Sequence, residues 1–102
     1  MLEAAADARA FVAGCTRANL DTDRMRVHAV ARVLAVLGEA ASRVSEETRT
    51  KHPSIPWPNV IGMRHRLVHA YFDVDLDIVW DTVQKELPDL ISELERILGP
   101  GA

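Results

Sequence analysis

The fold is decided by residues 23–50, whose sequence is DRMRVHAVARVLAVLGEAASRVSEETRT. Apolar residues recur in this stretch at intervals of three and four, the spacing that aligns side chains along one face of an α-helix. The sequence therefore predicts one long amphipathic helix that begins near Asp23, a capping residue, and ends near Thr50. Gly38, Ala40 and Ala41 form a patch of small side chains where a neighbouring helix can approach closely. The residues of the apolar stripe are Val27, Val30, Leu34, Leu37, Ala41 and Val44.

Further helices are predicted on both sides of this long helix. Residues 2–18 are rich in alanine and predict the first helix. Three prolines within residues 52–58 end the long helix, because each removes a backbone N–H and favours an extended residue before it. Trp57 is expected to anchor this loop in the core. Pro58 then begins a third helix, which we expect to run to about Tyr71.

The C-terminal part of the chain predicts a fourth helix with an interruption. Asp73 or Asp75 caps its start, Pro88 kinks or restarts it, and Gly99 ends it. Four or five amphipathic helices joined by short turns favour an antiparallel bundle. We therefore expect an all-α fold, a four- to five-helix bundle with a single domain over residues 1–102, whose modest core would gain from a partner subunit.

The composition excludes several classes of protein. Cys15 is the only cysteine, which excludes an internal disulfide framework and a cysteine-based zinc site, and favours a cytoplasmic location. No apolar run approaches the ~20 residues that cross a bilayer, and the first residues lack the pattern of a signal peptide. Residues 1–72 carry ten Lys/Arg and seven Asp/Glu (+3), whereas residues 73–102 carry two and eight (−6). The first part is compatible with a polyanionic partner or with solvated helix faces.

Side chains suited to chemistry gather in residues 64–71, RHRLVHAY. Guanidinium, imidazole and phenol groups can hold a phosphodiester, move protons near neutral pH and accept a covalent modification. Arg64 falls in the middle of the apolar stripe of the third helix, a position where an arginine needs a partner. One hypothesis is therefore structural: a buried Arg64 bonded to a carboxylate such as Glu39.

His69 lies about 140° from Arg64 around a regular helix, so the two side chains do not share one face. Either the helix is distorted near Ala70, or Arg64 and His69 of two copies line one groove across a twofold axis. The second arrangement suits RNA cleavage by the ribose 2′-hydroxyl, which needs a base, an acid and positive charge at the transition state. His65 and His69 have a spacing that could bind a metal, but no carboxylate or third histidine accompanies them. Neither a metal nor a cofactor is therefore expected.

The segment Arg64-x4-His69-x-Tyr71 resembles the signature of the HEPN superfamily, and in particular of its HepT-like toxin branch. The loop with proline and tryptophan and the run that follows His69 are similar to that family in order and spacing. The matching segments are residues 38–41, 52–57, 61–64 and 68–80, within a resemblance that covers roughly residues 20–95.

The resemblance implies a homodimeric, all-helical HEPN domain that acts as a metal-independent endoribonuclease, the toxin of a toxin–antitoxin pair. Arg64 and His69 would be catalytic, with His65 and Arg66 as supporting residues. The antitoxin would be a minimal nucleotidyltransferase that silences the toxin by transferring AMP from ATP to Tyr71. The added phosphate would place negative charge and bulk beside Arg64 and His69, where it competes with RNA.

Two alternatives stay open from the sequence. In one, the chain is a non-catalytic helical subunit that binds RNA or serves as the docking platform of a nucleotidyltransferase. In the other, Arg64 is structural, and its replacement would lower the free energy of unfolding by several kcal/mol, as expected when a buried ion pair is broken. A thermal melt measured beside an RNA-cleavage assay separates these cases from an enzyme.

Overall fold

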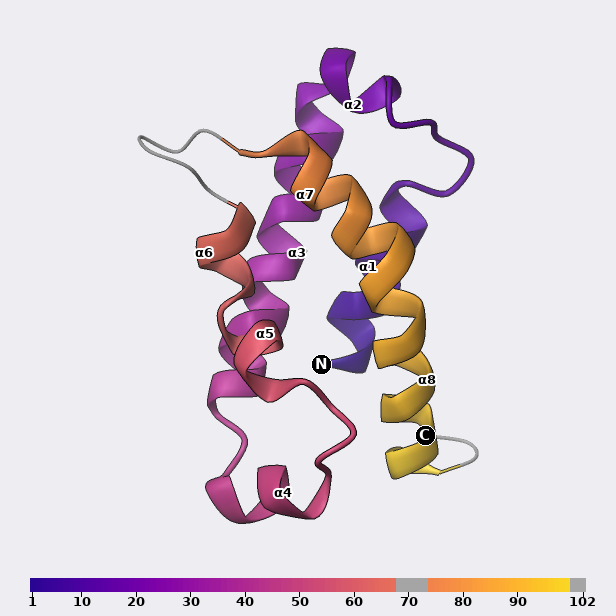
Figure 1. Cartoon of the computed structure of the whole chain (residues 1–102). Helices are drawn as coiled ribbons and strands as arrows, with labels where there is room; N and C mark the ends of the chain where they lie inside the picture. Colours follow the sequence, from indigo (N-terminus) through magenta and orange to yellow (C-terminus); the bar gives the residue numbers. More distant parts are fainter. Residues whose placement is uncertain (68–73, 100–102) are drawn as a thin grey trace.

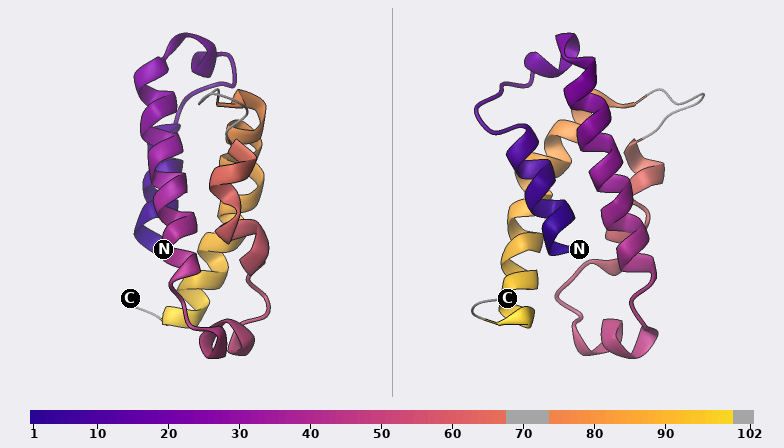
Figure 2. Two further views of the ribbon diagram at one scale, coloured as in Figure 1. Left: turned by 90° about the vertical axis from the view of Figure 1, so that its left-hand side faces the viewer. Right: turned by 180° about the vertical axis from the view of Figure 1, so that it is seen from behind.

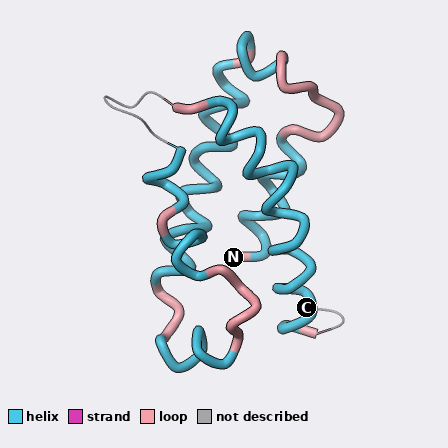
Figure 3. The backbone as a smooth tube through the Cα atoms, viewed as in Figure 1, coloured by secondary structure: helices cyan, strands magenta, loops and turns pink. Residues whose placement is uncertain are grey.

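The structure is a computed structural model that describes residues 1–67 and 74–99. Within those residues every regular element is a helix (Figures 1 and 3), which confirms the predicted all-α fold. The left view of Figure 2 shows two layers, with α1 and α3 in one and α5 to α8 in the other. In chain order the helices are α1 (Leu2–Phe11), α2 (Asn19–Thr22), α3 (Arg24–Ser42), α4 (Glu46–Lys51), α5 (Trp57–Ile61), α6 (Met63–Leu67), α7 (Leu76–Asp81), the π-helix η2 (Thr82–Glu86) and α8 (Leu87–Leu98).

The long helix α3 supplies the centre of the core, as the apolar spacing predicts. It packs against α1, α5 and α6. Asp23 caps its start by accepting a hydrogen bond from the backbone N–H of Arg26 at 3.0 Å, and this bond lowers the pKa of the Asp23 carboxyl. No helix in residues 1–67 and 74–99 is both long and apolar enough to cross a membrane. The residues of the predicted stripe that are buried are Val27, Val30, Leu34, Leu37 and Ala41.

The predicted end of this helix at Thr50 is wrong. Helix α3 ends at Ser42, and the separate helix α4 begins after Ser45. The Ser45 hydroxyl accepts a hydrogen bond from the backbone N–H of Thr48 at 3.1 Å, and its backbone is extended. A serine that caps a new helix interrupts the preceding one, because its side chain takes over a backbone donor that the continuous helix would bond internally.

The first helix is also shorter than the predicted span of residues 2–18. Helix α1 ends at Phe11, and Gly14 adopts a positive φ of 77°, a conformation that glycine reaches without strain. The Asn19 side chain accepts a hydrogen bond from the backbone N–H of Thr16 at 2.7 Å, just before α2. The positive φ of Gly14 and this local side-chain bond thus divide a stretch whose composition favours one helix.

The third predicted helix is divided in two. It begins at Trp57, with Pro58 in its first turn, and passes through a turn at Gly62 that separates α5 from α6. The expected anchoring of Trp57 is confirmed, because this side chain is only 9% exposed and its Nε1 donates to the backbone carbonyl of His52 at 3.0 Å. The predicted end of this helix, at Tyr71, lies outside the described residues.

The predicted interruption at Pro88 is confirmed as a change of helix type. Asp75 caps α7 by accepting a hydrogen bond from the backbone N–H of Ile78 at 3.0 Å; Asp73, the other predicted cap, lies outside the described residues. The chain then widens into η2 before α8, which carries Pro88 in its first turn and ends at Gly99 with a φ of 83°. A proline ring clashes with the carbonyl four residues earlier, so a wider turn at this place relieves the contact.

Helix α3 comes close to the other layer at Gly38, within the patch of small residues seen in the sequence. A Cβ atom at this position would lie 3.0 Å from the carbonyl oxygen of Val60 and 3.3 Å from that of Ile61. It would also lie 3.7 Å from the Cβ of Met63. The absence of a side chain at Gly38 thus sets the distance between α3 and the turn that connects α5 with α6.

We predict that Gly38→Ala lowers the free energy of unfolding by about 1–3 kcal/mol, the cost of overpacking a tight contact. Alanine favours a helix over glycine by about 1 kcal/mol, but the new methyl group would meet backbone oxygens that cannot rotate away. Chemical denaturation of both proteins measures the difference. Val36→Ala, an exposed position on the same helix, is the control and should change stability by less than about 0.5 kcal/mol. A Gly38→Ala protein as stable as the wild type would contradict this packing.

Candidate active site

Arg64 and His65 lie next to each other on the short helix α6, which two buried side chains hold against the fold. Met63 and Leu67 are each 1% exposed, and α6 packs against α3 and α7. Arg64 and His65 lie between these two anchors and are exposed. The amphipathic arrangement of one helical turn therefore presents a guanidinium and an imidazole at the surface.

Arg64 does not occupy the buried position that the sequence pattern indicates. Met63 takes that position, beside Gly38, and Arg64 projects from the margin of the apolar stripe. Glu39, the carboxylate expected to neutralise Arg64, instead accepts a hydrogen bond from Arg43 at 2.9 Å. Within residues 1–67 and 74–99, the Arg64 side chain makes no hydrogen bond or ion pair. The prediction of a buried pair between Arg64 and Glu39 is therefore wrong.

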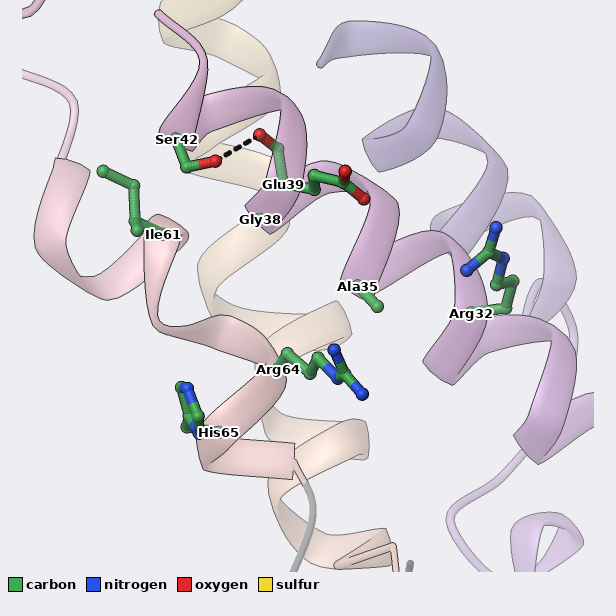
Figure 4. Close-up of a pocket in the computed structure, with 8 residues that line it drawn as sticks. All are labelled: Arg32, Ala35, Gly38, Glu39, Ser42, Ile61, Arg64 and His65. Atoms are coloured by element: carbon green, nitrogen blue, oxygen red, sulfur yellow. Dashed lines mark hydrogen bonds between the residues drawn. The ribbon is translucent and has the colours of Figure 1, made fainter.

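A cleft of about 430 Å³ lies between α3 and α6, and Arg64 and His65 belong to its wall (Figure 4). The opposite wall is one face of α3, whose lining residues follow each other at helical spacings of three and four. Ala35 and Gly38 have small or absent side chains, so a ligand can come close to the backbone of α3 on this side of the cleft. The residues that line the cleft are Arg32, Ala35, Gly38, Glu39, Ser42, Ile61, Arg64 and His65.

Arg32 is the lining residue that the sequence analysis missed. It is exposed, and its side chain makes no hydrogen bond or ion pair with any other residue of the described ranges. A signal was present, because Arg32 lies about 1.7 helical turns before Gly38 and its nearest sequence neighbours carry no acidic side chain. The cleft therefore holds two guanidinium groups without a bonded carboxylate, an arrangement suited to an anionic ligand such as a phosphodiester.

Arg66 does not line the cleft as Arg64 and His65 do, but bonds residues of other elements. Its guanidinium donates two hydrogen bonds to Glu86 of η2, from Nη1 to Oε2 at 3.0 Å and from Nη2 to Oε1 at 3.1 Å. Nη2 also donates to the carbonyl oxygen of Asn59 at 3.3 Å. Arg64 and His65 thus both line the cleft, whereas Arg66 is bonded to the last residue of η2.

The other two predicted site residues, His69 and Tyr71, lie outside the described residues. The described chain stops at Leu67 and resumes at Val74, and the backbone N–H of Asp75 donates to the carbonyl oxygen of Leu67 at 2.8 Å. In the described part of the chain, no three His, Cys, Asp or Glu side chains gather in a way that could hold a metal ion.

Comparison with known proteins identifies the class of this helical fold. The family described as Ribonuclease HepT-like matches residues 1–97. The chain therefore belongs to the HepT-like ribonuclease family, and the resemblance noted from the sequence is confirmed. No solved structure matches the chain.

Several relatives have names of the same kind. A protein of Caldanaerobacter subterraneus subsp. tengcongensis, named as a candidate RNase, is 40% identical over 76 residues, which are 74% of this chain and 68% of the relative. A candidate RNase of Methanocaldococcus jannaschii is 42% identical over 71 residues, 70% of this chain and 59% of the relative. The protein named "Probable ribonuclease HepT" of Thermococcus cleftensis is 37% identical over 75 residues, 74% of this chain and 68% of the relative. The chain thus matches about three fifths to two thirds of the length of these three relatives.

We predict that Arg66→Ala lowers the free energy of unfolding by about 1 kcal/mol, because it removes the bidentate ion pair with Glu86. The side chains of this pair are only 34% and 39% exposed, so water screens it less than a fully exposed pair. Arg66→Lys should recover only part of this stability, since an ammonium group cannot bond both oxygens in the same geometry. A double-mutant cycle with Glu86→Gln, followed by chemical denaturation, isolates the pair.

The control for this cycle is Lys85→Ala. Lys85 is 75% exposed and lies 3.5 Å from Asp81, so its ion pair should contribute almost nothing to stability. A coupling energy between Arg66 and Glu86 that is no larger than the one between Lys85 and Asp81 would contradict the structural role of Arg66.

Proposed function

We propose that this chain is a metal-independent endoribonuclease, the toxin of a toxin–antitoxin pair, which cleaves RNA in the cytoplasm with Arg64 and His69. The observation that supports this most is the environment of Arg64. A structural arginine would be paired, whereas Arg64 is exposed on a cleft wall without a partner in the described ranges. Membership of the HepT-like ribonuclease family supports the same reaction.

The proposed reaction uses the substrate's own ribose as the nucleophile. A base takes the proton of the 2′-hydroxyl, a bond forms between that oxygen and the neighbouring phosphorus, and the bond from phosphorus to the 5′-oxygen breaks. An acid protonates the leaving 5′-oxygen. His69 is proposed to transfer protons, and Arg64 is proposed to stabilise the charge that builds up on the phosphate oxygens. Because the nucleophile is a hydroxyl group of the substrate, the reaction needs no metal-activated water.

A homodimer is part of the proposal, because one imidazole cannot easily act as base and acid in the same step. Two copies related by a twofold axis would contribute two His69 and two Arg64 side chains to one groove. Arg64 is available for such an arrangement, since it is an exposed residue of α6.

Regulation is proposed to occur at Tyr71. A minimal nucleotidyltransferase antitoxin would transfer AMP from ATP to the Tyr71 hydroxyl, so that a bond forms between the phenolic oxygen and the α-phosphorus and pyrophosphate leaves. The transferred phosphate carries negative charge near the signature arginine and histidine. It would compete there with the phosphate of RNA.

We predict that Arg64→Ala and His69→Ala each lower the rate of RNA cleavage by about a hundredfold or more, the loss typical for a transition-state charge or a proton-transfer group. Cleavage of single-stranded RNA is measured with EDTA present, which should leave the wild-type rate unchanged. Arg64→Ala should keep the wild-type melting temperature, because Arg64 is exposed and bonded to none of the described residues.

Arg24→Ala is the control for the loss of one positive charge, and it should leave the rate of RNA cleavage unchanged. Arg24 is an exposed arginine at the start of α3 that is likewise without a bond in the described residues, and it does not line the cleft. Wild-type cleavage by the Arg64→Ala or His69→Ala protein would refute the assignment. RNA binding by the wild type without any cleavage product would favour the non-catalytic alternative.

We predict that Tyr71→Phe abolishes the transfer of radiolabelled AMP by the cognate nucleotidyltransferase and leaves RNA cleavage within about twofold of wild type. Phenylalanine keeps the ring but removes the accepting oxygen. The label on the purified protein and the cleavage rate before and after incubation with ATP are the measurements. AMP label that persists on the Tyr71→Phe protein would place the modification on another residue.

A further inference from the structure

Arg32 has the properties of a ligand-binding side chain that the proposed reaction does not yet use. It is exposed on α3 and has no bonded partner in residues 1–67 and 74–99. It lines the same cleft as Arg64, although 32 positions separate the two residues in the sequence. In Figure 4 the two arginines reach the hollow from different helices, with Ala35 as the α3 side chain drawn nearest to the space between them.

The size and walls of the cleft fit more than one phosphate group. Its volume of about 430 Å³ falls in the range of pockets that hold whole small molecules. Ala35 and Gly38 contribute little bulk, so the space between Arg32 and Arg64 is not filled by a large side chain of α3. An extended strand can therefore pass along α3 and reach both guanidinium groups.

The charges of the cleft favour a polyanion. Among the described residues that line the cleft, Glu39 is the only one with a carboxylate, and Arg43, which is not one of them, bonds it at 2.9 Å. Both side chains of this pair are more than half exposed, so the pair is weak, but it offsets the one negative charge that would repel a phosphate. The described lining residues then include two guanidinium groups without a bonded carboxylate, those of Arg32 and Arg64.

We propose that Arg32 binds a second phosphate of the RNA strand, next to the scissile phosphate held by Arg64. This inference rests on the proposed function, and it makes Arg32 a substrate-binding residue that does not take part in the chemical step. A contact with a phosphate that does not react is the same in the bound substrate and in the transition state. Its loss therefore raises KM and leaves kcat nearly unchanged.

The first experiment compares Arg32→Ala, Arg32→Lys and the wild type on a short single-stranded RNA. For Arg32→Ala we expect KM to rise about tenfold, in the range of a charge-assisted hydrogen bond, and kcat to stay within about twofold. Arg32→Lys should recover a large part of the affinity, because an ammonium group still meets the phosphate. Arg24→Ala, on the same helix and outside the cleft, should keep the wild-type KM, and equal melting temperatures exclude a folding effect.

The second experiment measures binding alone, in proteins that carry His69→Ala so that no RNA is cleaved. The affinity for the same RNA is measured at several salt concentrations. Removal of one phosphate contact should reduce the slope of log affinity against log salt by about 0.7 for a single strand. Arg32→Ala should show this reduction, whereas Arg32→Lys and Arg24→Ala should show the original slope.

The outcomes separate this inference from the function on which it rests. In one outcome the wild type cleaves RNA, but Arg32→Ala changes neither KM nor the slope of affinity against salt. This result would overturn the second phosphate contact, while the proposed ribonuclease activity would stand. A fall in kcat at constant KM would also overturn it, because Arg32 would then act on the reaction itself. If the wild type cleaves no RNA, the proposed function fails, and the binding experiment still decides whether Arg32 contacts the strand.

Discussion

The close approach of α3 to the turn between α5 and α6 sets the geometry of the candidate site. A side chain at Gly38 would meet the carbonyl oxygens of Val60 and Ile61 at 3.0 and 3.3 Å, so the backbones of the two layers come close together here. This contact brings Met63 into the core beside α3. Because Met63 fills the buried position on α6, Arg64 lies at the margin of the apolar face. Its guanidinium is exposed there and needs no buried carboxylate as a partner. The exposure of the proposed catalytic arginine thus follows from a glycine on another helix.

Helix α6 is too short to be stable alone, so its position depends on the contacts around it. An isolated helix of five residues does not form in water, because nucleation costs more than so few hydrogen bonds return. The buried side chains of Met63 and Leu67 hold one face. Arg66 ties α6 to Glu86, and the carbonyl oxygen of Leu67 accepts a bond from Asp75. These contacts preorganise Arg64 and His65, which is what a site that must hold a phosphate in a defined place requires.

Much of the fold could be predicted because burial along α3 follows helical periodicity. Val30, Leu34 and Leu37 are completely buried, as their spacing indicates. Helix ends were harder to predict, since Ser45 and Gly14 divide helices through local capping and a positive φ, and these effects compete with a composition that favours continuous helix.

The site was only partly visible in the sequence, for a related reason. The pattern placed Arg64 within the apolar stripe, but the side of a short helix that becomes buried depends on how closely another helix approaches. Arg32 was missed because the sequence does not show which arginines find partners. Both errors concern contacts between segments that are distant in the chain, and the periodicity of one segment carries no information about them.

The distribution of partners among the arginines supports the choice of this cleft over other basic surfaces. Most described arginines are bonded to an acidic side chain or to a carbonyl oxygen. Two of them, Arg17 and Arg66, bond Asp77 and Glu86 of the acidic C-terminal part, which offsets part of the net charge of +3 in residues 1–72. The bonded ones are Arg9, Arg17, Arg26, Arg43, Arg66 and Arg96. In the same described ranges, the side chains of Arg24, Arg32, Arg49 and Arg64 lack such a partner, and of these four Arg32 and Arg64 line one cleft together. An unpaired charge at a surface keeps its full attraction for a ligand, whereas a paired one must first give up its carboxylate. An RNA strand that binds this protein therefore gains the most binding free energy at the cleft where these two side chains lie.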